Sequence, residues 1–204
     1  MLCAVRIPNK LPIIALPNTY LFPSTSIPLH IFEDKYREML SDVIAGDRMF
    51  CIGAVQRSES SNDYLDNIYP YSTAGLLRAC VVNKNGTSNL MLEGIKRVKI
   101  TELDYKKPYK IGHVQEINSD TNDVDWVRSA DKKIRSILLG NSFLHENMNS
   151  EMDINQLLES IKTPEEIADF VSQYFISNQL TLQKLLSLES IDERLELILK
   201  SLLD

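Results

Sequence analysis

LPIIALPNTYLFPSTSIPLHIFEDKYREMLSDVI, residues 11–44, is the stretch that decides the fold. Its first half is apolar and extended, and the prolines that interrupt it exclude a helix because proline has no backbone N–H. After Phe32 the hydrophobic period becomes that of an amphipathic helix, and Gly46 is placed to end it. The segment predicts a strand, a proline-rich loop, a short strand at 29–32 and a helix. The helix is expected to bury Tyr36, Met39, Leu40, Val43 and Ile44.

Downstream of this helix the pattern is that of strands joined by turns. The apolar run RMFCIGAVQ, residues 48–56, is predicted to lie at the centre of a sheet. Asn-Lys-Asn-Gly at 83–86 predicts a hairpin, since Asn-Gly tolerates the positive φ angles of tight turns. The mostly polar residues 57–72 predict a long exposed loop. Further strands are predicted at 73–82, 89–92, 95–102 and 109–117, and together they indicate a small, closed or nearly closed antiparallel barrel.

The last part of the chain has helical periodicity. Residues 123–139 form one amphipathic pattern that ends at Gly140, and capping boxes predict helix starts at Thr163 and Ser190. Shorter patterns cover 151–161 and 182–188. Helices with one apolar face and short connections predict a bundle. The helix after Thr163 is expected to bury Ile167, Phe170, Val171, Tyr174 and Phe175.

The charge distribution indicates a boundary between the two parts. The net charge is −6, but residues 1–121 carry 14 Lys and Arg against 13 Asp and Glu, whereas residues 122–204 carry 8 against 15. We therefore expect a β-rich domain at 1–120 and a helical one at 121–204. The three cysteines have no CxxC spacing, and the N-terminus has the pattern of neither a secretory signal nor a membrane span. These features predict a cytoplasmic protein with reduced cysteines.

Two groups of residues carry a resemblance to a known family. They are the series Leu21-Phe22-Pro23, Ile27-Pro28-Leu29, Ile31-Phe32-Glu33, Tyr36-Arg37 and Met39, and the run Met91-Leu92-Glu93-Gly94-Ile95-Lys96-Arg97. The series resembles the signature of the Lon protease N-terminal (substrate-binding) domain family, and the run resembles its LEG-x-x-R segment. The resemblance implies an α+β fold, with an N-terminal PUA-like β pseudobarrel that has one inserted helix, followed by a C-terminal α-helical bundle.

The sequence lacks the motifs that a Lon protease needs for catalysis. A phosphate-binding loop requires G-x-x-x-x-G-K-[S/T], and the chain has no Gly-Lys pair. The resemblance to the N-terminal domain extends over nearly the whole chain, so we expect the Ser-Lys peptidase module to be absent from it. His30, His113 and His145 are not spaced as metal ligands, and packing explains Cys51 and Cys80 in apolar strands. We expect no enzyme activity, no cofactor and no metal.

A run of basic residues raises the alternative of an RNA-binding module. On a PUA-like barrel such residues contact phosphates. The run is diluted by acidic residues, the whole protein is acidic, and Tyr105 and Tyr109 are its interleaved aromatic residues. A solvated strand face explains the run better, so nucleic acid is not the expected partner. The basic residues are Lys96, Arg97, Lys99, Lys106, Lys107 and Lys110.

The predicted protein-binding site combines the loop before the first helix with the charged face of that helix. Apolar anchors with a charged rim suit the recognition of unfolded or exposed polypeptide segments. The simpler explanation is that the loop residues belong to the core and the charges face solvent, and the resemblance favours the site. The predicted site residues are Tyr20, Leu21, Phe22, Glu33, Asp34, Lys35, Arg37 and Glu38.

The sequence therefore predicts a non-catalytic protein- or peptide-binding module that resembles the substrate-recognition domain of ATP-dependent Lon protease. Its expected partners are unfolded or exposed polypeptide segments, and no membrane partner is expected. One alternative is a chain that selects substrates for an ATP-dependent protease whose ATPase and peptidase lie on another chain. The other alternative is the RNA-binding PUA-like module.

Overall fold

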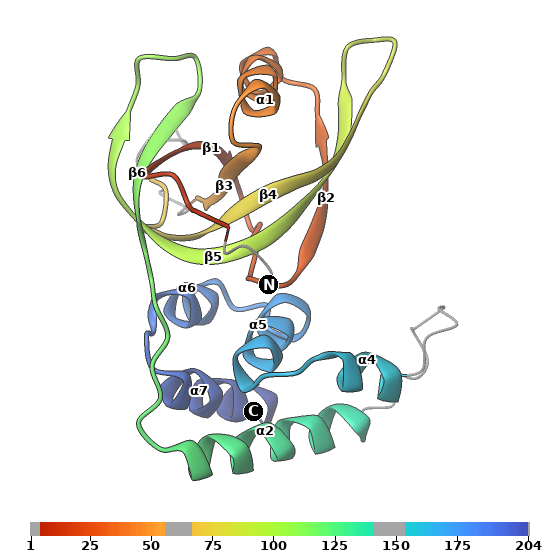
Figure 1. Cartoon of the computed structure of the whole chain (residues 1–204), viewed down its shortest axis with the longest axis vertical. Coiled ribbons are helices and arrows are strands. Elements are labelled where there is room, and N and C mark those ends of the chain that lie inside the picture. The colour runs from red at the N-terminus through yellow and green to blue at the C-terminus, as the bar shows by residue number, and fades with distance from the viewer. Residues whose placement is uncertain (1–4, 56–66, 141–153, 204) are drawn as a thin grey trace. The chain divides into compact units, whose positions relative to one another are not determined.

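The computed structural model describes residues 5–55, 67–140 and 154–203 (Figure 1). They form a six-stranded sheet and several helices, grouped into two compact units. Unit 1 comprises Met1–Asn118 and Ser177–Ser187, and unit 2 comprises Ser119–Ile176 and Leu188–Asp204. The predicted α+β fold class is confirmed. In the described part of the chain, no helix combines the length and the apolar character that crossing a membrane requires.

The strands of unit 1 close into a barrel. They are β1 (Lys10–Leu16), β2 (Ser26–Ile31), β3 (Met49–Ala54), β4 (Tyr71–Val82), β5 (Ser88–Asp104) and β6 (Lys110–Glu116). The sheet order is β2-β5-β4-β3-β1-β6, and an additional pairing of β5 with β6 closes a ring from which β2 is left out. The predicted pseudobarrel is therefore confirmed. The expectation that all pairs are antiparallel is wrong, because β1 and β3 are parallel and the chain crosses over between them.

Strand β5 takes the place of two predicted strands. Segments 89–92 and 95–102 belong to one continuous strand of 17 residues. Its first part pairs with β2 and β4, and its last part pairs with β6. At Gly94 the loop before β2 crosses this strand so closely that a Cβ atom would lie 2.7 Å from the Phe22 carbonyl carbon. Glycine is therefore required where the two backbones meet.

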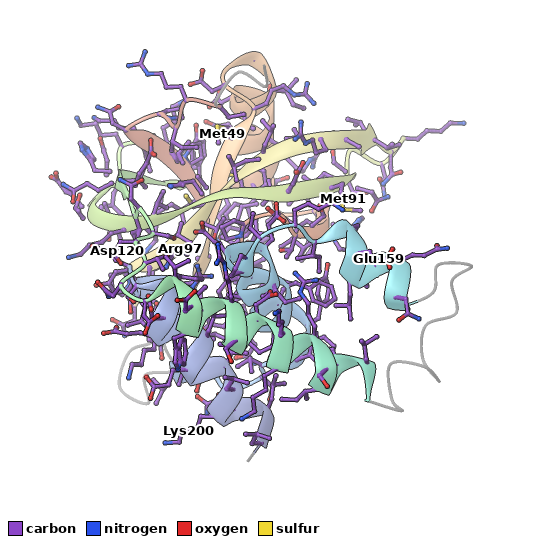
Figure 2. All side chains as sticks on the ribbon, turned by 60° about the horizontal axis from the view of Figure 1, so that its bottom comes forward. Met49, Met91, Arg97, Asp120, Glu159 and Lys200 are labelled. Atoms are coloured by element: carbon purple, nitrogen blue, oxygen red, sulfur yellow. The ribbon has the colours of Figure 1, made fainter. Side chains whose placement is uncertain are left out.

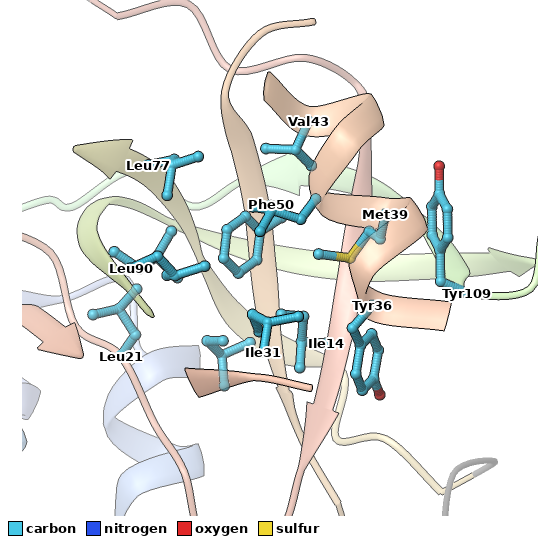
Figure 3. Packing of buried hydrophobic residues seen from close by; sticks show 13 residues of the cluster. Ile14, Leu21, Ile31, Tyr36, Met39, Val43, Phe50, Leu77, Leu90 and Tyr109 are labelled. Atoms are coloured by element: carbon cyan, nitrogen blue, oxygen red, sulfur yellow. The ribbon is translucent and has the colours of Figure 1, made fainter. Parts of the chain in front are cut away.

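Helix α1 (Asp34–Ala45) packs its apolar stripe into the barrel core (Figure 3). Tyr36, Met39, Leu40 and Val43 are buried as predicted. Ile44, which was also expected to be buried, is 42% exposed. It lies about 80° around the helix from Tyr36, at the margin of the stripe. The helix is joined to β1 by a 3.1 Å hydrogen bond that Ala15 N–H donates to the Tyr36 hydroxyl oxygen.

The turn and the central strand that were predicted in unit 1 are confirmed. Gly86 has a φ of 81°, and its N–H donates to the Asn83 carbonyl oxygen over 2.9 Å, so the hairpin joins β4 to β5. Every residue of β3 is buried, and β3 lies inside the sheet order. Of the predicted loop 57–72, residues 57–66 lie outside the described residues, and Tyr71 begins β4.

Unit 2 consists of helices, and the capping box predicted at Thr163 is present. At the box predicted at Ser190, Glu193 N–H donates to Ser190 Oγ over 3.4 Å. The helices are α2 (Val124–Leu139), α4 (Ile154–Ser160), α5 (Pro164–Phe175) and α7 (Ile191–Leu203). The Asp123 side chain accepts a 2.9 Å hydrogen bond from Trp126 N–H at the start of α2. Thr163 and Glu166 form the reciprocal capping box of α5, which begins with proline. Both caps are formed by residues within three positions of each other at the helix start.

The buried face of α5 differs from the predicted one. Phe170 and Phe175 are half-buried and Tyr174 is exposed. The reason is an ion pair between Asp169 and Arg194 of α7, both of which are buried. A paired carboxylate can face the interior, so the hydrophobic pattern alone misplaced the stripe. The buried residues of α5 are Ile167, Ala168, Asp169, Val171 and Ser172.

Helix α6 (Gln179–Ser187) belongs to unit 1, although it follows α5 in the sequence. The buried Arg97 of β5 (Figure 2) donates from Nη1 to the carbonyl oxygens of Leu185 and Leu186, over 3.3 and 3.2 Å. An arginine that bonds the last carbonyls stabilises the C-terminus of a helix. The domain limits 1–120 and 121–204 stay a prediction, and the contacts group residues 177–187 with the sheet.

We predict that Gly94→Ala lowers the free energy of unfolding by about 3 kcal/mol, because the added methyl group meets backbone atoms that have no room to move. Gly140→Ala is the matched control, since a Cβ atom there would meet its nearest neighbour at 3.5 Å, an ordinary contact. Urea unfolding followed by circular dichroism measures both variants. Unfolding midpoints equal to that of the wild type in both would refute the close crossing at Gly94.

Candidate functional site

The structure places the predicted apolar anchors inside unit 1. Tyr20, Leu21 and Phe22 are buried, and Phe22 is 0% exposed. Thr73 Oγ1 donates to the Leu21 carbonyl oxygen over 2.6 Å, and the Tyr20 hydroxyl donates to the Gln179 carbonyl oxygen over 3.4 Å. Burial raises the pKa of Tyr20 to about 12. These three side chains stabilise the fold and offer no surface to a partner.

The predicted charged residues lie at the start of α1. Lys35 Nζ is 3.0 Å from a Glu33 carboxylate oxygen, and Arg37 Nη1 is 2.9 Å from Asp34 Oδ1. Glu38 is exposed. Ion pairs with exposed partners contribute little free energy, and here the paired charges largely cancel. A role for these five residues in binding stays a prediction.

Strand β2 presents a different row of side chains on the outer side of the sheet. Successive residues of a strand point to opposite faces, so Pro28 and His30 point away from the core that their neighbours enter. Both are exposed. Phe32 follows directly after the strand, and its ring stacks on His30 with the ring centroids 6.1 Å apart. The outer side of β2 therefore carries three adjacent side chains, none of which is Asp, Glu, Lys or Arg.

The strand register continues this row onto β5 and β4. Pro28 pairs with Met91, which in turn pairs with Ala79. His30 pairs with Asn89, and Asn89 pairs with Val81. All of these residues are exposed. We call this surface the outer apolar face, and it comprises Pro28, His30, Phe32, Ala79, Val81 and Met91.

The large side chains of the outer apolar face are well exposed. Phe32 and Val81 are each 63% exposed and Met91 is 38% exposed. Met91 and Arg97 occupy separate positions along β5 (Figure 2). His30 is oriented by Asn89, whose Oδ1 lies 2.7 Å from His30 Nδ1. Exposed apolar side chains on neighbouring strands, here interrupted by Asn89, are a feature of interaction sites in folded proteins.

The charges beside the outer apolar face neutralise each other. Arg78 Nε is bonded to the Glu93 carboxylate, and this bond raises the pKa of Arg78. Glu93 lies opposite Ser26, two pairs beyond Pro28 and Met91 and on the same face of the sheet. The pair leaves no net charge at this margin. The surface is therefore suited to an uncharged, apolar partner.

The sequence contains a signal for this surface. It was missed because residues 29–32 were interpreted only as a short apolar strand. In the run from Ser26 to Phe32, the inward positions are aliphatic, while the outward positions hold Ser26, Pro28, His30 and Phe32, none of which is Asp, Glu, Lys or Arg. Natural edge strands commonly carry charged residues. The exposed outer face of β2 is therefore the informative observation, because an uncovered apolar patch indicates a missing partner.

The cysteines and histidines form no reactive centre in the described part of the chain. Within those residues, no group of three or more His, Cys, Asp or Glu side chains is placed to hold a metal ion. Burial raises the pKa of Cys51 to about 12, which disfavours the thiolate that a nucleophile needs. Cys80 is half-buried, and Cys3 and His145 lie outside the described residues.

Four of the basic residues in the predicted run make contacts within the fold. Arg97 is buried, and Lys107 Nζ lies 2.6 Å from Asp42 Oδ2. Lys99 and Lys110 lie over tyrosine rings, with Nζ 5.9 and 5.0 Å from the ring centroids. Binding to phosphates requires accessible cations along a common surface. The arrangement favours a structural role for these residues.

Comparison with known proteins places this geometry in a family. Residues 10–204 match the profile of the ATP-dependent protease La (LON) substrate-binding domain. The chain is 25% identical over 192 residues to the Lon protease of Flavobacterium johnsoniae, and 25% identical over 192 residues to that of Dictyoglomus thermophilum. Each alignment covers 93% of this chain, but 23% and 24% of those proteins. The chain thus spans about a quarter of the length of these curated relatives.

Solved structures show the same fold. The N-terminal domain of Mycobacterium avium complex Lon protease has a TM-score of 0.72 at 16% identity, with 96% of this chain and 98% of that chain covered. A Lon N-terminal domain protein from Xanthomonas campestris has a TM-score of 0.65 at 17% identity, with 94% and 97% covered. At these identities the likeness supports the fold alone.

We predict that alanine substitutions of Phe22 and Phe32 change the stability by very different amounts. Phe22→Ala lowers the free energy of unfolding by about 3–5 kcal/mol, because it empties a fully buried site. Phe32→Ala changes it by less than about 0.5 kcal/mol, because most of that side chain is exposed. Thermal or urea unfolding of the two variants tests both values. A large loss of stability in Phe32→Ala would mean that the outer apolar face is part of the core.

Proposed function

Because the chain belongs to the ATP-dependent protease La (LON) substrate-binding domain family, we propose that it binds exposed apolar segments of other polypeptides and has no catalytic activity of its own. The observation that carries this proposal is the outer apolar face, where Val81 and Met91 are exposed on paired strands and Phe32 is exposed directly after β2. The strands position these side chains without a partner, so little ordering is required on binding.

The size of this surface is consistent with weak, reversible binding. Fully burying one large apolar side chain contributes about 1.5–3 kcal/mol. Burying three of them contributes at most about 4.5–9 kcal/mol before the costs of association and of ordering the bound segment are subtracted, so weak binding is expected. Such binding suits the recognition of many clients, since contact with an apolar strand face does not require one particular side chain.

The chemistry of the surface favours unfolded over folded clients. Folded proteins rarely expose contiguous apolar surface, whereas unfolded chains expose the residues of their future core. The ion pair of Arg78 and Glu93 at the margin adds no net charge that would select a client by electrostatic attraction. We infer that hydrophobic exposure is the property by which clients are recognised.

A second proposal follows from the relatives. The chain matches about a quarter of proteins that are named Lon proteases, and this match lies in the substrate-binding domain. We propose that client binding by this chain serves an ATP-dependent protease whose ATPase and peptidase are supplied by other sequence. On this proposal the purified chain binds casein but neither cleaves it nor hydrolyses ATP.

We predict that replacing both Phe32 and Met91 by serine raises the dissociation constant for fluorescein-labelled, unfolded casein at least tenfold, which is about 1.4 kcal/mol. Fluorescence anisotropy measures the affinity. Ile44→Ser is the matched control, because Ile44 is a similarly exposed apolar residue of unit 1 that lies on α1 instead of the outer apolar face. It is expected to leave the affinity within about twofold.

The result also distinguishes the outer apolar face from the charged start of α1. Affinity unchanged in the Phe32 and Met91 double variant would exclude the outer apolar face as the binding surface. Lys35→Glu, which reverses one charge of the originally predicted site, is expected to have little effect on casein binding. A large effect of Lys35→Glu alone would instead place the site at α1.

A further inference from the structure

We propose that a client segment binds in extended form, as an added strand along the free edge of β2. This inference rests on the proposed function and specifies how the client is held. β2 stands at one end of the sheet order, and in the described part of the chain it pairs with β5 alone. Figure 1 shows it at one side of the barrel. An unpaired strand edge is a template for a further strand.

Hydrogen bonds around β5 determine which groups of β2 point to the free edge. Along an antiparallel ladder, hydrogen-bonded pairs alternate with pairs that are not hydrogen-bonded. Asn83 N–H donates to the Thr87 carbonyl oxygen over 2.8 Å at the hairpin between β4 and β5. The alternation then directs the odd-numbered residues of this part of β5 toward β4. The even-numbered residues 88, 90 and 92 are left to bond with β2.

A second hydrogen bond gives the same assignment from the other end. Gly94 N–H donates to the Thr25 carbonyl oxygen over 2.9 Å, which continues the even-numbered series of β5. The β2 partners of this series are residues 27, 29 and 31. The backbone groups that remain for the free edge belong to Ser26, Pro28 and His30. Proline at 28 agrees with this, because it has no N–H to give to the ladder with β5.

The free edge offers a defined set of hydrogen-bonding groups. Ser26 and His30 each present an N–H and a carbonyl, whereas Pro28 presents a carbonyl alone. A client backbone can satisfy these groups whatever its side chains are, which suits a site that accepts many sequences. The client residue opposite Pro28 must supply its own N–H, so a proline at that client position loses the bond.

The inward side chains of β2 also indicate an uncovered edge. Ile27 and Leu29 point toward the core but are half-buried, whereas the inward-pointing Phe50 and Leu92 are fully buried. A strand added beside β2 would cover the exposed parts of Ile27 and Leu29 with its inward side chains. Its outward side chains would lie beside the outer apolar face. Both sides of the added strand thus meet apolar residues.

The absence of charge on β2 defines the class of client. Its sequence SIPLHI contains no Asp, Glu, Lys or Arg, although natural edge strands commonly carry charges that prevent pairing. A charged client side chain would lose its hydration against apolar neighbours without gaining an ionic partner. The edge therefore fits an uncharged segment with apolar residues on both faces. That composition belongs to strands that are buried when the client is folded.

Amide hydrogen exchange of the whole chain tests this binding mode. The probe is the acetylated and amidated peptide Ser-Val-Ile-Thr-Val-Ile-Ser at saturating concentration. Strand addition predicts that exchange of the Ser26 and His30 amides slows by at least about tenfold on binding, because they become hydrogen-bonded. A control peptide with proline in place of the central threonine is expected to bind at least about tenfold more weakly.

Proline substitutions in β2 give a second, independent test. Ser26→Pro removes an edge N–H that does not bond to β5, so the chain is expected to fold normally and bind the peptide at least about threefold more weakly. Ser26→Ala controls for the side chain and is expected to bind like the wild type. Leu29→Pro removes an N–H of the ladder with β5 and is expected to be destabilised instead.

The outcomes separate this inference from the proposed function. Peptide binding that is lost in the Phe32 and Met91 double variant, with no change in exchange at Ser26 and His30, would overturn strand addition and leave the proposed function intact. No peptide or casein binding at all would overturn both. Slowed exchange at Ser26 and His30, together with weaker binding by Ser26→Pro and not by Ser26→Ala, supports strand addition.

Discussion

The pairing of β5 with three neighbouring strands is the constraint on which unit 1 depends. β5 holds β2 and β4 along its first part and β6 along its last part, so one strand both closes the ring and attaches β2 to it. The strand can do this because the loop before β2 crosses it at Gly94, where the backbones touch. The same crossing buries Phe22, so the resemblance-bearing residues of that loop are structural.

The closed ring also explains why one strand is left with an open edge. Ring closure satisfies both edges of β1, β3, β4 and β6, whereas β2 receives a partner on one side. Its inner residues join the core with α1, and its outer residues Pro28 and His30, with Phe32, remain uncovered. Exposed apolar side chains and a free backbone edge are a liability for aggregation unless they serve binding. Their occurrence on the same strand is what makes β2 the centre of the proposed function.

Local sequence signals predicted the parts of the fold that depend on near neighbours. The hairpin at Gly86, the capping box of Thr163 and the buried stripe of α1 through Val43 are all set by residues a few positions apart. Features set by distant residues were missed. The ion pair of Asp169 with Arg194 makes the buried face of α5 differ from the predicted one. A hydrogen bond from Arg97 to a carbonyl of α6 connects that helix to the sheet. For the site, residue types suggested a polypeptide-binding surface that includes Tyr20–Phe22, but these residues are buried, and the surface that we propose lies at the outward positions of β2. The sequence did not reveal this because exposure depends on which strands pair.

Helix α6 follows a helix of unit 2 in the sequence but belongs to unit 1. The polypeptide leaves unit 1 after Asn118, comes back to it for Ser177–Ser187 and departs again at Leu188. A truncation after Asn118 would retain every strand of the barrel yet leave the Arg97 guanidinium without the two carbonyls that accept its hydrogen bonds. Such a fragment would lack helix α6 of unit 1. A separately added peptide that spans residues 177–187 is expected to bind to the fragment and restore these hydrogen bonds. Segments of the two units therefore alternate along the sequence, so a single cut in the chain does not separate one complete unit from the other.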